Sequence, residues 1–179
     1  MRLYLARHPQ PETLPGICYG GSDLPPTEAG VAATLEALSR QGLHELPVFS
    51  SPLRRCAALA RRLAHAPVFD ARLAEMHFGA WEMRSWDDIP RAEVDAWSAD
   101  LLHYRPGGGE SVLDVAGRVA AFLGELRAAG LEQALIICHA GTIRLLASLH
   151  QGGGIEEAAL RAAQAAHHIG YGELLVLKD

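Results

Sequence analysis

The stretch that decides the fold is MRLYLARHPQP, residues 1–11. Residues 2–6 predict a short apolar strand, and Pro9, which lacks an N–H and has a fixed φ, favours a change of direction. A strand this apolar is typical of the centre of a sheet, where both faces are buried. We therefore expect Arg7 and His8 at the carboxyl end of a central strand, where ligands bind in open α/β sheets. On this stretch alone, an ordinary surface turn is the alternative.

Length and composition indicate a globular chain without a bulk charge signal. The chain has 179 residues, of which 49% are hydrophobic and 21% charged, so one compact domain over 1–179 is expected. The net charge of −5 argues against binding nucleic acid through overall electrostatics. Any positive site must therefore be local.

The cysteines and the apolar runs bear on the setting of the protein. Cys18, Cys56 and Cys138 are far apart and odd in number, which suggests neither a disulfide framework nor a zinc site. No window approaches ~18 consecutive apolar residues, and the Arg7-His8 pair interrupts the first apolar run too early for a signal peptide. We expect no metal, no membrane association and a reducing cytoplasmic setting.

Two further strands end in residues that carry chemistry. Residues 47–50 predict a strand, followed by Ser51 as N-cap and a helix over 52–65 with two arginines in its first turn. Because arginine opposes the helix dipole there, Arg54 or Arg55 needs a partner, while the other suits a solvated face. Residues 134–138 are the strongest strand prediction, and they end at His139.

The order of these elements indicates the fold class. Helices are predicted over 28–41, 112–129, 142–150 and 155–166, and further strands over 67–70 and 172–177. His167 and His168 fall in a loop, where a pair of histidines is more often exposed to solvent than bound to a metal. The alternation predicts a three-layer α/β/α sandwich with a mostly parallel central sheet.

The middle of the chain supplies two candidate acids and a cover for the site. Glu75 and Glu82 lie among Phe, Trp and Met residues, which would raise a carboxyl pKa and suit a general acid. A structural carboxylate is an equal alternative for either. Residues 84–105 suggest a polar helix that could act as a lid, and the glycines of 106–111 suggest a hinge. The loop over 9–26 is expected to fold back over the site.

The strand ends together favour phosphate chemistry. Two arginine side chains match phosphate oxygens in geometry, and the helix N-termini after residues 51 and 139 add N–H donors, with Ala140 as a candidate phosphate contact. Positive neighbours lower a histidine pKa and keep the ring neutral and nucleophilic, so that it can attack phosphorus.

Several motifs, in order across residues 3–144, resemble the histidine phosphatase superfamily, which includes the cofactor-dependent phosphoglycerate mutases. They are LARH at 5–8, GGSDLPPTEAG at 20–30, SPLRR at 51–55, EMHFGAWE at 75–82 and CHAG at 138–141. The resemblance implies a phosphoglycerate mutase-like fold, His8 as the phosphorylated nucleophile, and Glu75 as proton donor. It also implies a phosphate pocket of Arg7, Arg55 and His139; Arg55 rather than Arg54 matches the family pattern.

Two positions depart from that pattern. Pro9 stands where the family usually has Gly, and Leu14 where it usually has Asn; a lost phosphate contact could come from Ser22. Other features, including GICYG at 16–20 and FGAWEMR at 78–84, are similar to the alpha-ribazole phosphatase branch. Those enzymes remove the 5′-phosphate of alpha-ribazole phosphate during assembly of the cobalamin nucleotide loop.

The resulting hypothesis is a metal-independent, cofactor-free phosphomonoesterase with a lid-like insertion at about 82–108. Its partner would be a small phosphomonoester, with alpha-ribazole 5′-phosphate as the leading substrate. A broad-specificity sugar or nucleotide phosphatase is the first alternative, and a non-catalytic phospho-ligand-binding protein is the second. The sequence is compatible with either a monomer or a homodimer.

Overall fold

The centre of the molecule is a five-stranded sheet in the order β3-β2-β4-β1-β5, seen in a computed structural model that describes residues 1–166 and 168–178. The strands are β1 (Arg2–Arg7), β2 (Val48–Ser50), β3 (Val68–Phe69), β4 (Gln133–Cys138) and β5 (Leu174–Leu177). All neighbours pair in parallel except β5, which is antiparallel to β1. The mostly parallel sheet predicted from the sequence is confirmed.

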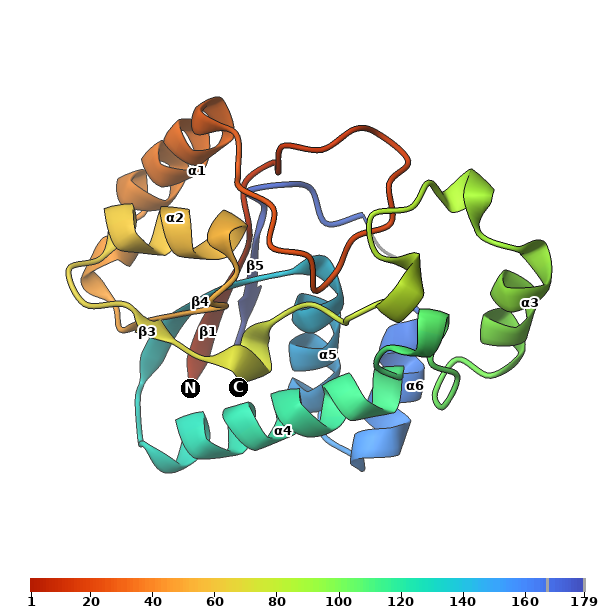
Figure 1. Cartoon of the computed structure of the whole chain (residues 1–179). Helices are drawn as coiled ribbons and strands as arrows, with labels where there is room; N and C mark the ends of the chain where they lie inside the picture. The colour runs from red at the N-terminus through yellow and green to blue at the C-terminus, as the bar shows by residue number, and fades with distance from the viewer. Residues whose placement is uncertain (167, 179) are drawn as a thin grey trace.

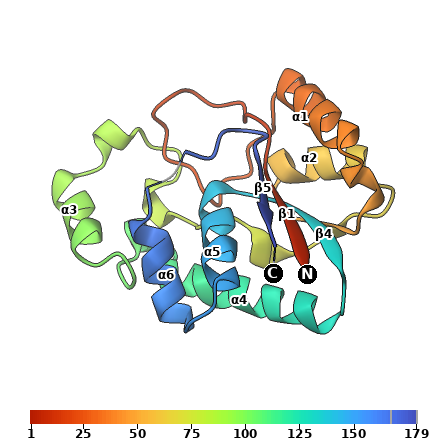
Figure 2. The ribbon, with the colours of Figure 1, turned by 180° about the vertical axis from the view of Figure 1, so that it is seen from behind.

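Helices cover both faces of this sheet (Figures 1 and 2). α1 (Glu28–Arg40) and α2 (Arg54–Leu63) lie on one face, and α4 (Val112–Ala128), α5 (Ala140–His150) and α6 (Ile155–Gln164) lie on the other. α3 (Arg91–Ala99) lies away from the sheet, at one end of the molecule. The α/β/α sandwich is therefore present as expected.

The strand sequences explain why the sheet is buried on both sides. In β1, Leu3 and Leu5 pack with α4 to α6, whereas Ala6 packs with α1 and α2. In β4, Ile136 and Ile137 divide in the same way. This two-residue alternation places apolar side chains in both cores, and the residue after each strand emerges at the carboxyl edge.

Some predicted boundaries are wrong for local reasons. The helix expected from 52 begins at Arg54, with Leu53 as N-cap; the Ser51 hydroxyl instead accepts from the Leu53 N–H at 3.3 Å. The helix expected from 142 begins at Ala140, with His139 as N-cap. The capping box of Ser111 and Asp114 at the start of α4 is present.

The lid-like region is less regular than predicted. Instead of a helix over 84–105, the chain forms short 3-10 turns around α3, because Pro90 stands as the N-cap of α3 and interrupts helical bonding before it. The 3-10 turns of the chain are Leu43–Glu45, Ala71–Leu73, Gly79–Trp81, Trp86–Asp88 and Pro106–Gly108. Phe78, Val94, Trp97 and Tyr104 pack against buried Cys18, Trp81 and Ile89, which gives this region its own small apolar cluster.

Two of the glycines predicted to form a hinge, Gly107 and Gly109, pack closely against backbone. A Cβ at Gly107 would lie 2.3 Å from the Phe78 carbonyl oxygen, and one at Gly79 would lie 2.1 Å from the Gly107 carbonyl oxygen. The Glu110 N–H also donates to the His77 carbonyl at 2.8 Å. The glycines therefore allow two backbone segments to pack closely, which fixes the base of the lid-like region.

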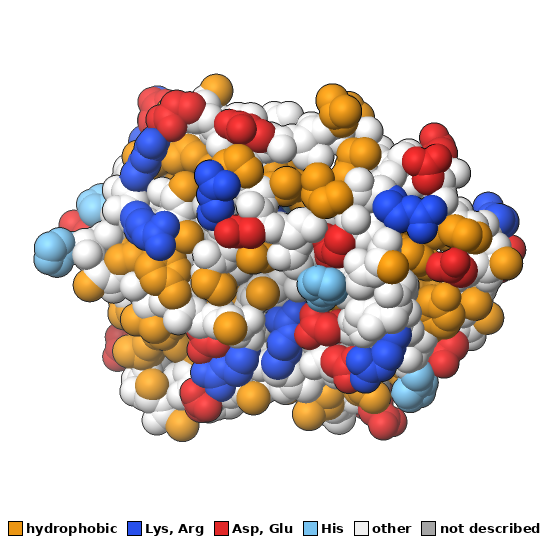
Figure 3. Space-filling view, in the orientation of Figure 1, with side chains coloured by type: hydrophobic (Ala, Val, Ile, Leu, Met, Phe, Trp, Pro, Cys, Tyr) orange, Lys and Arg blue, Asp and Glu red, His pale blue; other side chains and the backbone are white. Residues whose placement is uncertain are grey.

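The surface carries no large patch of one charge on the face shown in Figure 3, where basic and acidic side chains alternate with apolar ones. Within residues 1–166 and 168–178, no helix combines the length and apolarity that a membrane span requires. His168 is exposed, and the prediction for His167 falls outside the described residues.

Candidate active site

His8 follows the last residue of β1 and is almost fully buried, with 2% of its surface exposed. Its backbone N–H donates to the Cys138 carbonyl at 2.9 Å, which extends the pairing of β1 with β4 by one residue. The ring Nδ1 lies 2.7 Å from the Pro9 carbonyl oxygen. Because a carbonyl can only accept, Nδ1 carries the proton and the neutral ring has its lone pair on Nε2.

The surroundings of His8 keep it uncharged. Burial is the largest influence and the Arg55 guanidinium the next, and together with Arg7 they lower the pKa of His8 to about 3 despite the bond to Pro9. Its Nε2 lone pair is therefore available at neutral pH. That is the form of imidazole that can act as a nucleophile.

His139 lies beside His8, with the two ring centroids 5.1 Å apart. Arg55 Nε donates to Nδ1 of His139 at 3.2 Å, so its Nε2 carries the proton and donates to Ser51 Oγ at 2.9 Å. Burial and Arg55 lower the pKa of His139 well below its usual value. Both ring nitrogens are thus engaged with protein groups, Nδ1 with Arg55 and Nε2 with Ser51.

Arg55 is a buried cation at the start of α2, with 0% of its surface exposed. Besides His139, it donates to the carbonyls of Ser22 at 2.7 Å and Gly20 at 2.6 Å. Arg54, the neighbouring arginine, is exposed, so the predicted division between one partnered and one solvated arginine is confirmed.

Arg7 is the second cation of the site. One of its terminal nitrogens donates to the Ile169 carbonyl, and its guanidinium lies 4.2 Å from the ring centroid of Tyr171. Its Nε is buried without a hydrogen-bond partner among the described residues.

These two guanidiniums create a local demand for an anion. Among the residues that the structure describes, neither Arg7 nor Arg55 pairs with a carboxylate. Buried charge is costly unless it is paired. Ala140, the first residue of α5, lines the same cavity, so the positive end of that helix faces the site. The arrangement suits a phosphoryl dianion.

Glu75 stands at the edge of this positive centre. Its two carboxylate oxygens accept from the Met76 N–H at 3.1 Å and the Gly141 N–H at 3.0 Å. A Cβ at Gly141 would lie 2.5 Å from Glu75 Oε1, so glycine at this position leaves room for the carboxylate. The sequence-predicted acid is thereby held at the start of α5.

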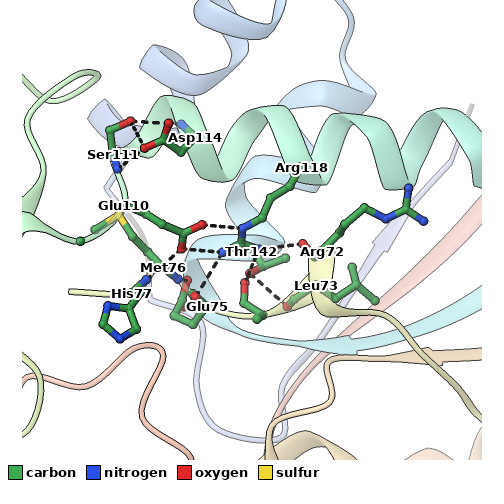
Figure 4. A network of polar contacts seen from close by, with 12 residues as sticks. Arg72, Leu73, Glu75, Met76, His77, Glu110, Ser111, Asp114, Arg118 and Thr142 are labelled. Carbon is green, nitrogen blue, oxygen red and sulfur yellow. Dashed lines mark hydrogen bonds and ion pairs between the residues drawn. The ribbon is translucent and has the colours of Figure 1, made fainter. Parts of the chain in front are cut away.

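A polar network fixes the segment that carries Glu75 (Figure 4). Arg118 reaches from α4 and donates to the carbonyls of Arg72, Ala74 and Glu75, at 2.7, 2.7 and 3.2 Å. Its charge is balanced by Glu110, whose carboxylate also accepts from the His77 N–H at 3.0 Å. Burial opposes the charge of Glu110, but Arg118 and His77 outweigh it and lower the pKa of Glu110.

The structure assigns Glu82 and Ser22 to loop closure. Glu82 accepts from the N–H groups of Gly20, Gly21, Ser22 and Phe78 and from the Ser22 hydroxyl. Burial alone would raise the pKa of Glu82, but these donors outweigh it and lower the pKa, contrary to the sequence-based expectation. Because the Ser22 hydroxyl is directed to Glu82, its expected contact with phosphate has no support; its carbonyl instead orients Arg55.

The two departures from the family pattern have small local effects. Pro9 contributes its carbonyl to His8, a contact that any residue could make. Leu14 is 74% exposed, so its side chain adds nothing to the pocket.

A cavity of about 540 Å³ opens from this centre. Arg7, His8, Arg55 and Glu75 line one end of it. The rest is mainly apolar and aromatic, lined by residues that include Ile17, Tyr19, Phe78, Trp86, Val94, Trp97, Leu101 and Leu145. The loop over 9–26 and the lid-like region both contribute, as predicted for a cover over the site.

Sequence reasoning missed several residues of this site. Ser51 had been assigned to a helix cap, and its contact with His139 depends on the pairing of β2 with β4. Tyr171, Arg118 and Arg144 carry no motif that would place them there, because their positions depend on how distant segments pack. Within the described residues, no cluster of three or more His, Cys, Asp or Glu side chains could hold a metal ion.

The sequence profile of the histidine phosphatase superfamily, branch 1, matches residues 3–170. The chain belongs to the histidine phosphatase superfamily. Relatives of this chain are named as phosphatases. This histidine phosphatase is therefore an enzyme that acts on phosphate esters.

Named relatives of this histidine phosphatase differ in substrate. The adenosylcobalamin/alpha-ribazole phosphatase of Salmonella typhimurium is 32% identical over 157 residues, 82% of this chain and 77% of the relative. A putative phosphoserine phosphatase 2 of Hydrogenobacter thermophilus is 32% identical over 166 residues, 87% and 81% respectively. The solved mycobacterial glucosyl-3-phosphoglycerate phosphatase superposes with a TM-score of 0.80 at 26% identity, over 99% of this chain and 89% of that one.

Proposed function

We propose that this histidine phosphatase hydrolyses phosphate monoesters in two steps through a phosphohistidine at His8. The observation that carries this proposal is the fixed tautomer of His8: Nδ1 donates to Pro9, and the Nε2 lone pair belongs to a buried ring between two arginines. In the first step Nε2 forms a bond to phosphorus while the bond from phosphorus to the ester oxygen breaks. Glu75 gives its proton to the departing alkoxide.

In the second step the Glu75 carboxylate takes a proton from water. The water oxygen bonds to phosphorus, the bond to His8 Nε2 breaks, and inorganic phosphate leaves; the neutral ring and the protonated Glu75 are restored. Arg7 and Arg55 balance the charge of the phosphoryl oxygens throughout. Fixed donors of this kind, together with positioning, supply most of the rate in phosphoryl transfer.

We propose alpha-ribazole 5′-phosphate as the substrate. Its leaving group carries a flat dimethylbenzimidazole, which suits a cavity lined by Phe78, Trp86 and Trp97. Trp97 Nε1 and Arg144 Nε are buried there without a partner among the described residues, and they could donate to the ring nitrogen and the ribose hydroxyls. The relative from Salmonella typhimurium supports the same substrate class.

A nucleotide phosphatase is the second candidate. The same aromatic wall would accept any flat base on a ribose phosphate. A sugar phosphate has less support, because the cavity away from the phosphate end is mainly aromatic and aliphatic.

The first experiment tests His8. We expect His8→Ala to abolish hydrolysis of p-nitrophenyl phosphate and to leave the circular dichroism spectrum unchanged. Exposed His65 provides the matched control, and His65→Ala should behave as wild type. Acid-quenched wild-type enzyme given a radiolabelled substrate should carry label that His8→Ala lacks. Activity of His8→Ala within the wild-type range would refute the mechanism.

A substrate panel then tests the finer proposal. Alpha-ribazole 5′-phosphate should give the highest kcat/KM, above adenosine 5′-phosphate, phosphoserine and glucose 6-phosphate. A higher value for the nucleotide would favour the second candidate.

A further inference from the structure

Residues 169–173, just before β5, hold the end of β1; we call this segment the brace. The Arg7 side chain donates to the Ile169 carbonyl, and the Arg7 N–H donates to the Glu173 carbonyl at 2.9 Å. The Gly172 N–H donates to the His8 carbonyl at 3.2 Å. The brace thus contacts both residues that β1 delivers to the site, and Figures 1 and 2 show it beside the loop that follows β1.

Tyr171 is the side chain through which the brace reaches the site. The Arg7 guanidinium lies over its ring, 4.2 Å from the centroid, and the His8 ring centroid is 5.6 Å away. The Tyr171 hydroxyl is 2.8 Å from that of Tyr19, which comes from the loop after β1. Burial and the bond to Tyr171 raise the pKa of Tyr19, so this phenol stays protonated at neutral pH.

Tyr171 acts from outside the cavity. Among the described residues, Arg7, His8 and Tyr19 line the cavity, whereas Tyr171 does not and is 45% exposed. All three of its aromatic or polar contacts are therefore with residues that face the substrate. The Tyr19 ring in turn lies under Arg55, 5.4 Å from the guanidinium carbon.

We propose that Tyr171 is a positioning residue for the phosphate site, acting through Arg7 and Tyr19; this rests on the proposed function, in which Arg7 holds the phosphoryl group. The guanidinium of Arg7 has a hydrogen bond at one terminal nitrogen and none at Nε. The Tyr171 ring covers one face of the Arg7 guanidinium and so restricts the rotation of that group. Cation–π contacts of this kind act on orientation as well as energy.

The contact also links the two cations. Tyr171 touches Arg7 directly and Tyr19 through the hydroxyl pair, and Tyr19 touches Arg55. Through these contacts, Tyr171 influences the distance between the guanidiniums of Arg7 and Arg55, which bind the same phosphoryl dianion in the proposed function. A bidentate grip depends on that geometry.

The test compares three variants by calorimetric binding of inorganic phosphate and by steady-state kinetics with p-nitrophenyl phosphate. Tyr171→Leu removes the ring, whereas Tyr171→Phe and Tyr171→Trp keep an aromatic face. We expect Tyr171→Leu to weaken phosphate binding and raise KM about fivefold to thirtyfold, the range of a cation–π contact, with a smaller change in kcat. The two aromatic variants keep a ring over Arg7 and lose only the hydroxyl contact with Tyr19, so their loss should be smaller, within about threefold of wild type.

The matched control is Phe69, an exposed aromatic residue whose ring centroid lies 4.9 Å from the guanidinium carbon of Arg61. Phe69→Leu removes a similar contact between residues that do not line the cavity, and it should leave phosphate affinity unchanged. If Tyr171→Leu does not fold, Tyr171→Gln removes the same ring while retaining a polar surface.

Two results would overturn the proposal: wild-type phosphate affinity in Tyr171→Leu, or an equal loss in Tyr171→Leu and Tyr171→Phe. Because phosphate binding is measured without turnover, its outcome is independent of whether His8 becomes phosphorylated. Failure of the brace and failure of the proposed mechanism can therefore be told apart.

Discussion

At the scale of single residues, the two central histidines make stability depend on pH. In an unfolded chain histidine titrates near about 6.5, whereas in the folded protein the pKa of His8 is about 3 and that of His139 is also well below its usual value. Between those pH values the unfolded chain binds more protons than the folded one. The free energy of unfolding must therefore fall as the pH falls through this window.

This argument gives a measurable slope. Each such histidine contributes at most about 1.4 kcal/mol per pH unit. Between about pH 6 and about pH 4, the free energy of unfolding in urea should fall less steeply with decreasing pH for His8→Ala than for wild type. The difference in slope should be up to about 1.4 kcal/mol per pH unit. Exposed His65 supplies the control, since His65→Ala should keep the wild-type slope. Identical slopes for His8→Ala and wild type would contradict a buried, neutral His8.

The sequence placed His8, Arg7, Arg55 and His139 at strand and helix ends, and the structure brings all four together. The histidine tautomers could not be predicted from the sequence, because they depend on which atom of the folded protein faces each ring nitrogen. Pro9 fixes the proton of His8 with a backbone carbonyl, and Arg55 fixes that of His139. The Ser22 expectation has no support for the same reason: its hydroxyl donates to Glu82, and Ser22 does not line the cavity.

At the scale of elements, α4 and α5 together aim Glu75. Arg118 on α4 donates to three carbonyls of the segment before and at Glu75, and Thr142 on α5 donates to the Ala74 carbonyl at 3.2 Å. The Gly141 N–H then holds the carboxylate itself. None of these contacts involves the substrate, so their effect on catalysis passes through the position of one acid.

We therefore predict that Arg118→Met and Glu75→Gln share a kinetic signature. A general acid matters most for poor leaving groups, so both variants should slow alkyl phosphates by about 10²-fold or more and p-nitrophenyl phosphate less. Rates across a series of substituted phenyl phosphates measure this dependence. Arg105→Met, which removes an arginine that pairs with Asp114, is the matched control. An equal loss for good and poor leaving groups would argue against the acid role of Glu75.

Element identity could be predicted from the sequence more securely than element ends. The apolar run of β4 and the capping box of α4 depend on neighbouring residues, so they were predictable. The start of α2 depends on Ser51, whose hydroxyl accepts from both the Leu53 N–H and His139, the N-cap of α5. Gly107 and Gly109 look flexible in sequence, yet their backbone packs closely against residues 77–80.

At the scale of the whole molecule, the sheet order explains how distant residues meet. β1 lies between β4 and β5, so the carboxyl end of β1 faces His139 on one side and the brace on the other. The parallel pair was predictable from apolar strands that end in histidine. The position of Tyr171 was not, because it follows from the antiparallel return of β5 alongside β1.

Residues of the lid-like region line the cavity, so we predict that this region selects among leaving groups, and a Trp86 variant tests the prediction. Trp86 lines the cavity, is 39% exposed and meets Phe78 edge to face with centroids 6.0 Å apart. A substrate ring that stacks there should lose about 1 kcal/mol of binding in Trp86→Ala, equivalent to about fivefold in kcat/KM. A small ester such as glycerol phosphate should be unaffected, because its leaving group does not extend to Trp86. Phe69→Ala, which removes an exposed ring outside the cavity lining, controls for loss of aromatic surface. An equal effect on both esters would mean that Trp86 supports the fold of the lid-like region instead of contacting the leaving group.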